Sequence, residues 1–114
     1  MEKNITFTSH HKSQKGITGT SLQGYAKASR SYLEMLFGPP LSEPVDDYKT
    51  SYEWHISVKN YSAVIGFVSI YDYKSDSSDD PEEEIHWHIG AKNLDDASAV
   101  INFITTGKTY EVNV

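Results

Sequence analysis

The chain has 114 residues, 38% of them hydrophobic and 23% charged, which is the composition of a folded globular domain and not of a disordered segment. It contains no cysteine, so disulfide frameworks, thiolate zinc sites and cysteine nucleophiles are excluded. A formal net charge of −6 argues against binding to nucleic acid phosphates and favours a basic partner or simple solubility. No run of residues predicts a membrane span or a signal peptide, and we expect one cytoplasmic domain covering residues 1–114.

The N-terminal part is predicted to contain one short strand and one helix. Residues 4–8 alternate between polar and apolar side chains, as a strand does, and residues 9–18 are polar and predict a loop. A helix capped by Thr20 or Ser21 would follow and end at Gly38, before two prolines. The side chains at helical spacing are Leu22, Tyr25, Ala26, Ser29, Tyr32, Leu33 and Leu36.

Two strands are predicted in the middle of the chain, after an extended connection over residues 39–48. Residues 52–59 alternate strictly, which predicts a strand with one face buried. A turn over residues 59–62 leads into residues 63–73, which are apolar on both faces at their start and predict a central strand. Gly66 within it indicates a bulge or the close approach of another element.

The C-terminal part begins with an acidic loop over residues 75–84. Residues 85–89 alternate again and predict a third strand of the meander. A second helix is expected from its cap at Asn93 to Gly107, with a buried stripe, and residues 110–114 predict a short edge strand. The residues of the stripe are Leu94, Ala97, Val100, Ile101 and Ile104.

The order of the elements is therefore strand, helix, three strands, helix and short strand. Because the middle strands are joined by hairpin-length links, the sequence predicts an α+β fold. We expect an antiparallel sheet of three to five strands with two helices packed on one face. A sheet edge left unpaired in this way makes a homodimer possible.

The pattern LFGPP…DDYKTSYEW…IYDYK…WHIG resembles one shared by small uncharacterised proteins encoded by phages. The resemblance implies a phage or prophage origin and a common fold, and it brings no activity with it. It covers roughly the middle half of the chain. The residues that carry it are Phe37, Gly38, Pro40, Tyr48, Lys49, Glu53, Trp54, Ile70, Tyr71, Tyr73, Lys74 and Trp87, His88, Ile89 and Gly90.

Histidines form the first candidate site. On a strand, His86 and His88 share one face and Trp87 takes the other, so we expect the imidazoles to point to solvent. With His55 and Asp72 they would form a set that can hold zinc or act in acid–base chemistry. His-x-His is a common pattern, however, and an ordinary solvated sheet face is the preferred interpretation. We expect no metal, no cofactor and no catalytic residues.

The acidic loop lacks the spacing and the central glycine of a calcium-binding EF-hand. It is either a solvated hairpin tip or a surface that engages a basic partner. Tyrosines beside it are favoured residues for protein interfaces. The predicted contact residues are Tyr71, Tyr73, Asp76, Asp79, Asp80, Glu82, Glu83, Glu84 and His86.

The sequence thus predicts a small acidic binding protein of phage type that engages a basic surface of a host protein, as a counter-defence inhibitor. Direct binding to nucleic acid or membrane is not expected. The alternative is a binder of small molecules or nucleotides, or a metal-dependent enzyme, that uses the histidines of the sheet face.

Overall fold

A computed structural model of the chain describes residues 2–42, 51–73, 79–107 and 111–113. The elements, in chain order, are β1 (Glu2–His10), the 3-10 helix η1 (Lys15–Ile17), β2 (Ser21–Ser29), α1 (Arg30–Phe37), β3 (Glu53–Asn60), β4 (Ala63–Tyr71), β5 (Glu84–Ala91), α2 (Leu94–Thr106) and β6 (Glu111–Asn113).

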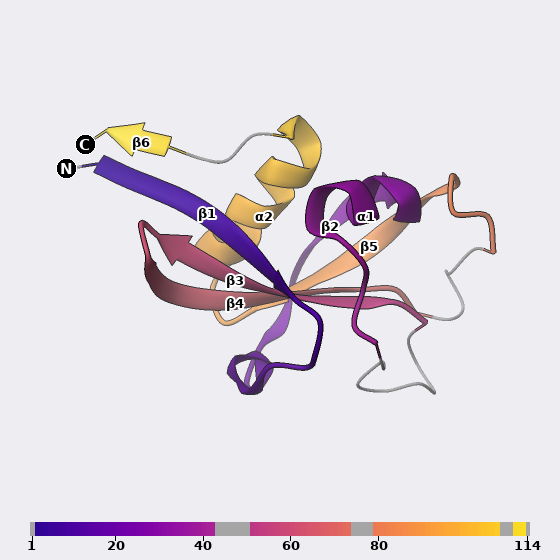
Figure 1. Cartoon of the computed structure of the whole chain (residues 1–114), viewed down its shortest axis with the longest axis horizontal. Coiled ribbons are helices and arrows are strands. Elements are labelled where there is room, and N and C mark those ends of the chain that lie inside the picture. The colour runs from indigo at the N-terminus through magenta and orange to yellow at the C-terminus, as the bar shows by residue number, and fades with distance from the viewer. Residues whose placement is uncertain (1, 43–50, 74–78, 108–110, 114) are drawn as a thin grey trace.

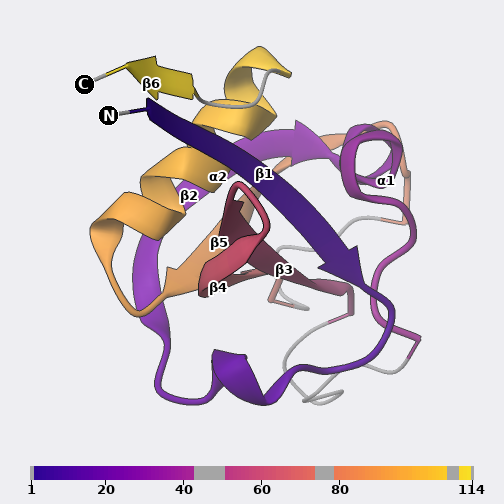
Figure 2. The same cartoon turned by 60° about the vertical axis from the view of Figure 1, so that its left-hand side comes forward.

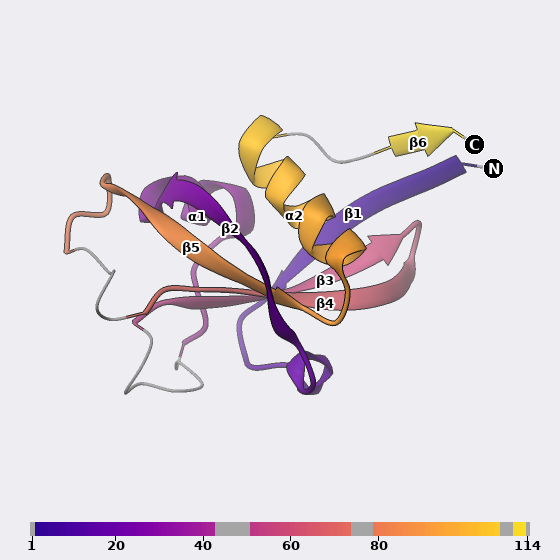
Figure 3. The ribbon, with the colours of Figure 1, turned by 180° about the vertical axis from the view of Figure 1, so that it is seen from behind.

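The strands form one twisted sheet in the order β2-β5-β4-β3-β1-β6, and every pairing is antiparallel. Both helices lie on the same side of this sheet, and η1 lies on the other side (Figures 1 and 3). The predicted α+β class is therefore confirmed. The predicted tail strand is present as β6, which pairs with the start of β1 beside the N-terminus (Figure 2).

The first predicted helix is wrong over its N-terminal half, because residues 21–29 form the edge strand β2. The side chains that face α2 in this segment are small, and a Cβ atom added at Gly24 would lie 3.0 Å from Cδ1 of Ile101. Ala26 pairs with Trp87 on the neighbouring strand β5, and its small side chain leaves room for the indole. The alternation of small and large residues mimics a helical stripe here, whereas its structural role is to let α2 pack close to the sheet.

Helix α1 begins only at Arg30, where Ser29 caps it. The Ser29 hydroxyl accepts a hydrogen bond of 3.1 Å from the backbone N–H of Tyr32, which satisfies one of the unpaired donors of the first turn. The helix ends at Gly38, as predicted, with a φ of 80° that favours glycine.

The core lies between the sheet and the two helices and is centred on both tryptophans. The rings of Trp54 and Trp87 meet edge to face, with centroids 5.3 Å apart and an interplanar angle of 80°. Both are buried, and each indole N–H donates to a backbone carbonyl, that of Gly38 for Trp54 and that of Ala28 for Trp87. This arrangement satisfies the polar end of each indole inside an apolar core.

Helix α2 has its predicted boundaries, with Asn93 as the cap and a left-handed Gly107 after its end. Ala97, Val100 and Ile104 are buried as expected, but Leu94 is 60% exposed because the first residue of the helix points away from the sheet. No helix in the described part of the chain has both the length and the apolar character to cross a membrane.

The β3–β4 hairpin turns at Tyr61 and Ser62, as predicted. Its register shifts next to Gly66, and a Cβ atom placed on Gly66 would lie 2.1 Å from Oδ2 of Asp96 on α2. Both expectations for Gly66, a bulge and a close approach, are therefore confirmed.

Candidate functional site on the sheet face away from the helices

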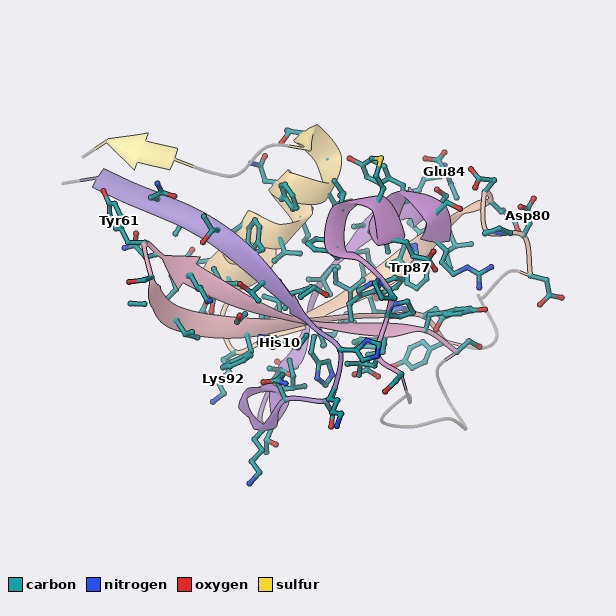
Figure 4. The ribbon with its side chains drawn as sticks, in the orientation of Figure 1. His10, Tyr61, Asp80, Glu84, Trp87 and Lys92 are labelled. Atoms are coloured by element: carbon teal, nitrogen blue, oxygen red, sulfur yellow. The ribbon has the colours of Figure 1, made fainter. Side chains whose placement is uncertain are left out.

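The sheet face opposite the helices carries polar and aromatic side chains and has two ends of different character. At one end the segment of residues 11–20, which contains η1, covers the strands. At the other end the strands run toward the acidic β4–β5 connection, where Tyr25 and Tyr73 are 53% and 39% exposed. Asp80 in that connection and Glu84 at the start of β5 lie at the end of the molecule opposite Tyr61 (Figure 4).

The covered end holds a buried polar network around His55. The backbone N–H of Gln14 donates to Nδ1 of His55 at 2.9 Å, so Nδ1 carries no proton and Nε2 is the protonated nitrogen. Nε2 lies 2.6 Å from Oε2 of Glu53 and donates to it. Both ring nitrogens are thus satisfied, and the histidine fastens residues 11–20 to the sheet.

Gly16 is the point at which this covering segment touches the sheet. A Cβ atom at Gly16 would lie 2.2 Å from a ring carbon of Phe67, which is closer than real Cβ contacts. Gly16→Ala is therefore expected to displace the segment and to break the bond between Gln14 and His55. Amide hydrogen exchange at Gln14 should accelerate at least tenfold, while exchange in α2 stays unchanged. Equal protection of Gln14 in both proteins would show that Gly16 is not the contact.

Beside this network, Nε2 of His10 lies 2.9 Å from the hydroxyl of Ser57. A histidine hydrogen-bonded to a serine can act as the base that activates the hydroxyl as a nucleophile. Ser57 is only 1% exposed, however, and its hydroxyl also lies 3.4 Å from the carbonyl of Thr8. The pair therefore joins β1 to β3, with the serine hydroxyl enclosed between the two strands.

The pKa of His10 predicts how stability depends on pH. Burial lowers this pKa from its usual 6.5, and the nearby charges of Lys59 and His55 lower it further. As the pH drops below about 6.5, His10 therefore takes up a proton more readily in the unfolded chain than in the folded one. The free energy of unfolding should fall over the same range. Urea denaturation between about pH 7 and pH 5 should show a shallower decline for His10→Gln.

The open end is organised around His88, which is packed between three tyrosines. Its ring stacks on Tyr71 at 5.3 Å and meets Tyr73 at 4.4 Å and Tyr25 at 5.1 Å edge to face. His88 is 7% exposed, and its Nδ1 is buried without a hydrogen-bond partner among the described residues. The expectation that both imidazoles of the His-x-His pair face solvent is therefore wrong for His88, because the tyrosines cover it, while His86 is exposed.

Tyr71 is the most enclosed of the three tyrosines. Burial raises its pKa to about 12, and Tyr73 next to it adds to the shift. Its hydroxyl therefore stays protonated at neutral pH and acts as a hydrogen-bonding group. Tyr25 and Tyr73, by contrast, offer exposed edges, and Tyr25, His86 and His88 line an open hollow of about 480 Å³ with Ile85.

The acidic turn lies at the same end of the sheet but beside α1, where Asp80 and Glu83 line a small hollow with Arg30 and Tyr52. Its carboxylates are exposed, and the backbone around them is held in place: the N–H of Glu82 donates to Oδ1 of Asp80, and the N–H of Ser31 donates to the carbonyl of Pro81. Asp76 lies outside the described residues. The exposed acidic residues of the turn are Asp79, Asp80, Glu82, Glu83 and Glu84.

The residues of the alternative metal set, His55, Asp72, His86 and His88, do not share one face of the sheet. Asp72 follows Ile70 on the helix side of β4, while His55 and His88 lie on the other side. Asp72 is fully buried, and its Oδ1 accepts hydrogen bonds from the backbone N–H groups of Ser51 and Tyr52 at 2.8 and 2.9 Å. The described residues contain no group of three histidines or carboxylates arranged to hold a metal ion. Parity along β4 explains the error, because residues 70 and 72 must share a face.

Tyr25 and Gln14 belong to this face but were not predicted for it. Tyr25 was assigned to the buried stripe of a helix, and only the correct strand assignment places it opposite His88. Gln14 contributes its backbone N–H, which no side-chain pattern could reveal.

Comparisons with protein families, with curated proteins and with solved structures found no match for this chain.

Proposed function

We propose that this protein is a binding module that engages the basic surface of another protein through its aromatic–acidic surface. We define this surface as Tyr25, Tyr73, His86 and the acidic turn of Asp79, Asp80 and Glu82–Glu84. The observation that supports the proposal is that the exposed Tyr25 and Tyr73 pack against a buried histidine, and that Tyr25 lines a hollow at the same end of the sheet as five exposed carboxylates.

Each part of the surface has a physical role in this proposal. Tyrosines that are already packed lose little conformational entropy on binding and are frequent energetic centres of interfaces. Carboxylates at the rim attract a basic partner and raise the association rate. The hollow beside His86 accommodates one side chain of the partner. Following the resemblance to phage proteins, we propose a protein of the bacterial host as the partner and inhibition of a defence function as the outcome, in the host cytoplasm.

Charge at the acidic turn is tested by a pair of matched double variants. Glu82→Gln with Glu83→Gln removes two charges from the turn, and Glu34→Gln with Asp95→Asn removes two exposed charges elsewhere. We expect the first pair to slow association with the purified host partner about tenfold at low salt, and the second pair to change it far less. Surface plasmon resonance at two salt concentrations measures this. Equal effects of the two pairs would assign the role to net charge and refute the acidic turn as the contact.

The tyrosines are tested by the dissociation rate of the same complex. Tyr73→Ala removes an exposed ring next to His88, and we expect dissociation to accelerate by about 30-fold, since interface tyrosines are worth about 2 kcal/mol or more. Tyr73→Phe keeps the ring and serves as the matched control for packing. The partner is first identified by affinity purification from the bacterial host, and the proposal fails if no protein binds directly once purified.

A further inference from the structure

The small hollow beside the start of α1 is polar. It has a volume of about 10 Å³, and Asp80 and Trp87, which line it, mark its place in Figure 4. Its lining comes from α1, the entry to β3, the end of β4, the acidic turn and β5. The other lining residues are Arg30, Tyr52, Asp72, Glu83 and Ile85. We call it the Asp72 hollow.

Asp72 brings an unsatisfied hydrogen-bond acceptor to this hollow. The residue is 0% exposed, and its Oδ1 already accepts from the backbone N–H groups of Ser51 and Tyr52. Its Oδ2 is buried and has no hydrogen-bond partner among the described residues. Native proteins satisfy nearly all buried polar atoms, because a buried carboxylate oxygen without a partner is costly. We therefore expect a hydrogen-bond donor at Oδ2.

Arg30 brings an unsatisfied donor to the same hollow. Its Cζ lies 4.2 Å from the centroid of the Tyr52 ring, and this cation–π contact holds the guanidinium in place. Its Nε is buried and likewise has no partner in the described part of the chain. Arg30 and Asp72 form no direct ion pair. A buried donor and a buried acceptor thus border one small space without reaching each other.

Size and charge identify the molecule that fits this space. A volume of about 10 Å³ is close to the smallest, about 10–15 Å³, that holds one water molecule, and it is too small for an organic ligand. Arg30 repels a metal cation, and the carboxylates of Asp72, Asp80 and Glu83 repel an anion. Water is neutral, and it can accept from Nε–H and donate to Oδ2 at once.

We propose that the Asp72 hollow binds a single long-lived water molecule, which accepts a hydrogen bond from Nε–H of Arg30 and donates one to Oδ2 of Asp72. Arg30 precedes Ser31, whose backbone N–H donates to the carbonyl of Pro81 in the acidic turn. The water therefore ties the base of the acidic turn to the core. The site does not depend on the proposed partner, because neither Arg30 nor Asp72 belongs to the aromatic–acidic surface.

Cross-peaks between water and protein in NMR spectra of the full chain test the proposal. The Nε–H of Arg30 should exchange slowly enough to be observed. It should also show a cross-peak with water, and the sign of this peak in rotating-frame spectra should indicate dipolar contact and not proton exchange. Tyr52→Phe keeps the ring under the guanidinium and removes a hydroxyl proton that could relay the signal, so the cross-peak should remain. An Nε–H that exchanges too fast to be seen, or one without this cross-peak in either protein, would overturn the proposal.

Asp72→Asn tests the acceptor. It replaces Oδ2 with an NH2 group, so the water would face two donors and no acceptor. Exchange of the Arg30 Nε–H should then accelerate at least about tenfold. Glu83→Gln neutralises another carboxylate that lines the hollow and should leave this exchange unchanged. Equal acceleration in the two variants, or none in Asp72→Asn, would show that Oδ2 is not the acceptor.

Two further measurements complete the test. The backbone amide of Ser31 should also exchange faster in Asp72→Asn, and unchanged protection of this amide would refute the tie between the water and the acidic turn. A crystal structure of the parent protein does not depend on any variant. One ordered water within about 2.5–3.2 Å of both Nε of Arg30 and Oδ2 of Asp72 would support the proposal. A direct bond between these two atoms, or no water density between them, would contradict it.

Discussion

Replacing Trp87 with alanine is expected to lower the free energy of unfolding by about 3–5 kcal/mol, the usual cost of deleting a buried aromatic side chain. The indole is 1% exposed and meets Trp54 edge to face, so its loss opens a cavity in the middle of the core. The carbonyl of Ala28 also loses the N–H that bonds to it at 2.9 Å. Urea denaturation followed by circular dichroism measures the change.

The neighbouring His86→Ala provides the control on the same strand. His86 is exposed on the other face of β5, so its removal should change stability by no more than about 0.5 kcal/mol. The pair of variants tests the period-two assignment of β5 directly. A loss below about 1 kcal/mol for Trp87→Ala, or a larger loss for His86→Ala, would contradict the placement of the indole in the core.

Strands and helix ends were predictable wherever the local chemistry had a single interpretation. The alternation in residues 52–58 places Trp54 in the core, and Asn93 and Gly107 fix the two ends of α2. Segment 21–29 was predicted as helix alone, although Gly24, Ala26 and Ala28 also satisfy the period of two that a strand requires. The packing of α2 decides between helix and strand, and that is a contact between distant parts of the sequence.

The sheet face away from the helices shows why burial was harder to predict than strand position. Alternation correctly places His55 and His88 on this face, but it does not say what covers them. Residues 11–20 cover His55 through a backbone N–H and a glycine, neither of which leaves a hydrophobic signal. His88 is covered by tyrosines from β2, β4 and the residues just after β4, whose meeting depends on strand order. Polar residues on one face of a strand therefore do not establish that this face is exposed to solvent.

Strand order also explains how the candidate surface arises. β5 lies between β2 and β4, so His88 receives Tyr25 from one side and Tyr71 from the other. The same neighbours bring the acidic turn to the start of α1, where the N–H of Ser31 donates a hydrogen bond to the carbonyl of Pro81. The proposed partner would thus meet tyrosines that the neighbouring strands hold in place, which reduces the entropy lost on binding.

Asp72→Ala is the second substitution with a large expected effect, a loss of about 3 kcal/mol or more in the free energy of unfolding. The fully buried carboxylate accepts from two backbone N–H groups through Oδ1, and hydrogen bonds to a charged group contribute about 1.5–3 kcal/mol each. Alanine leaves both donors buried without an acceptor at the entry to β3. Thermal and urea denaturation would measure the loss.

Asp72→Asn separates this structural role from a role as a metal ligand. The amide oxygen of asparagine accepts from the same two N–H groups, so we expect it to recover roughly half or more of the stability that alanine loses. We expect added zinc to leave the melting temperatures of the parent protein and of both variants unchanged, because the histidines lie on the opposite face of the sheet from Asp72. A zinc-dependent rise in melting temperature that disappears in both Asp72 variants would instead place a metal ligand at this position and overturn the assignment of Asp72 to the backbone of residues 51 and 52.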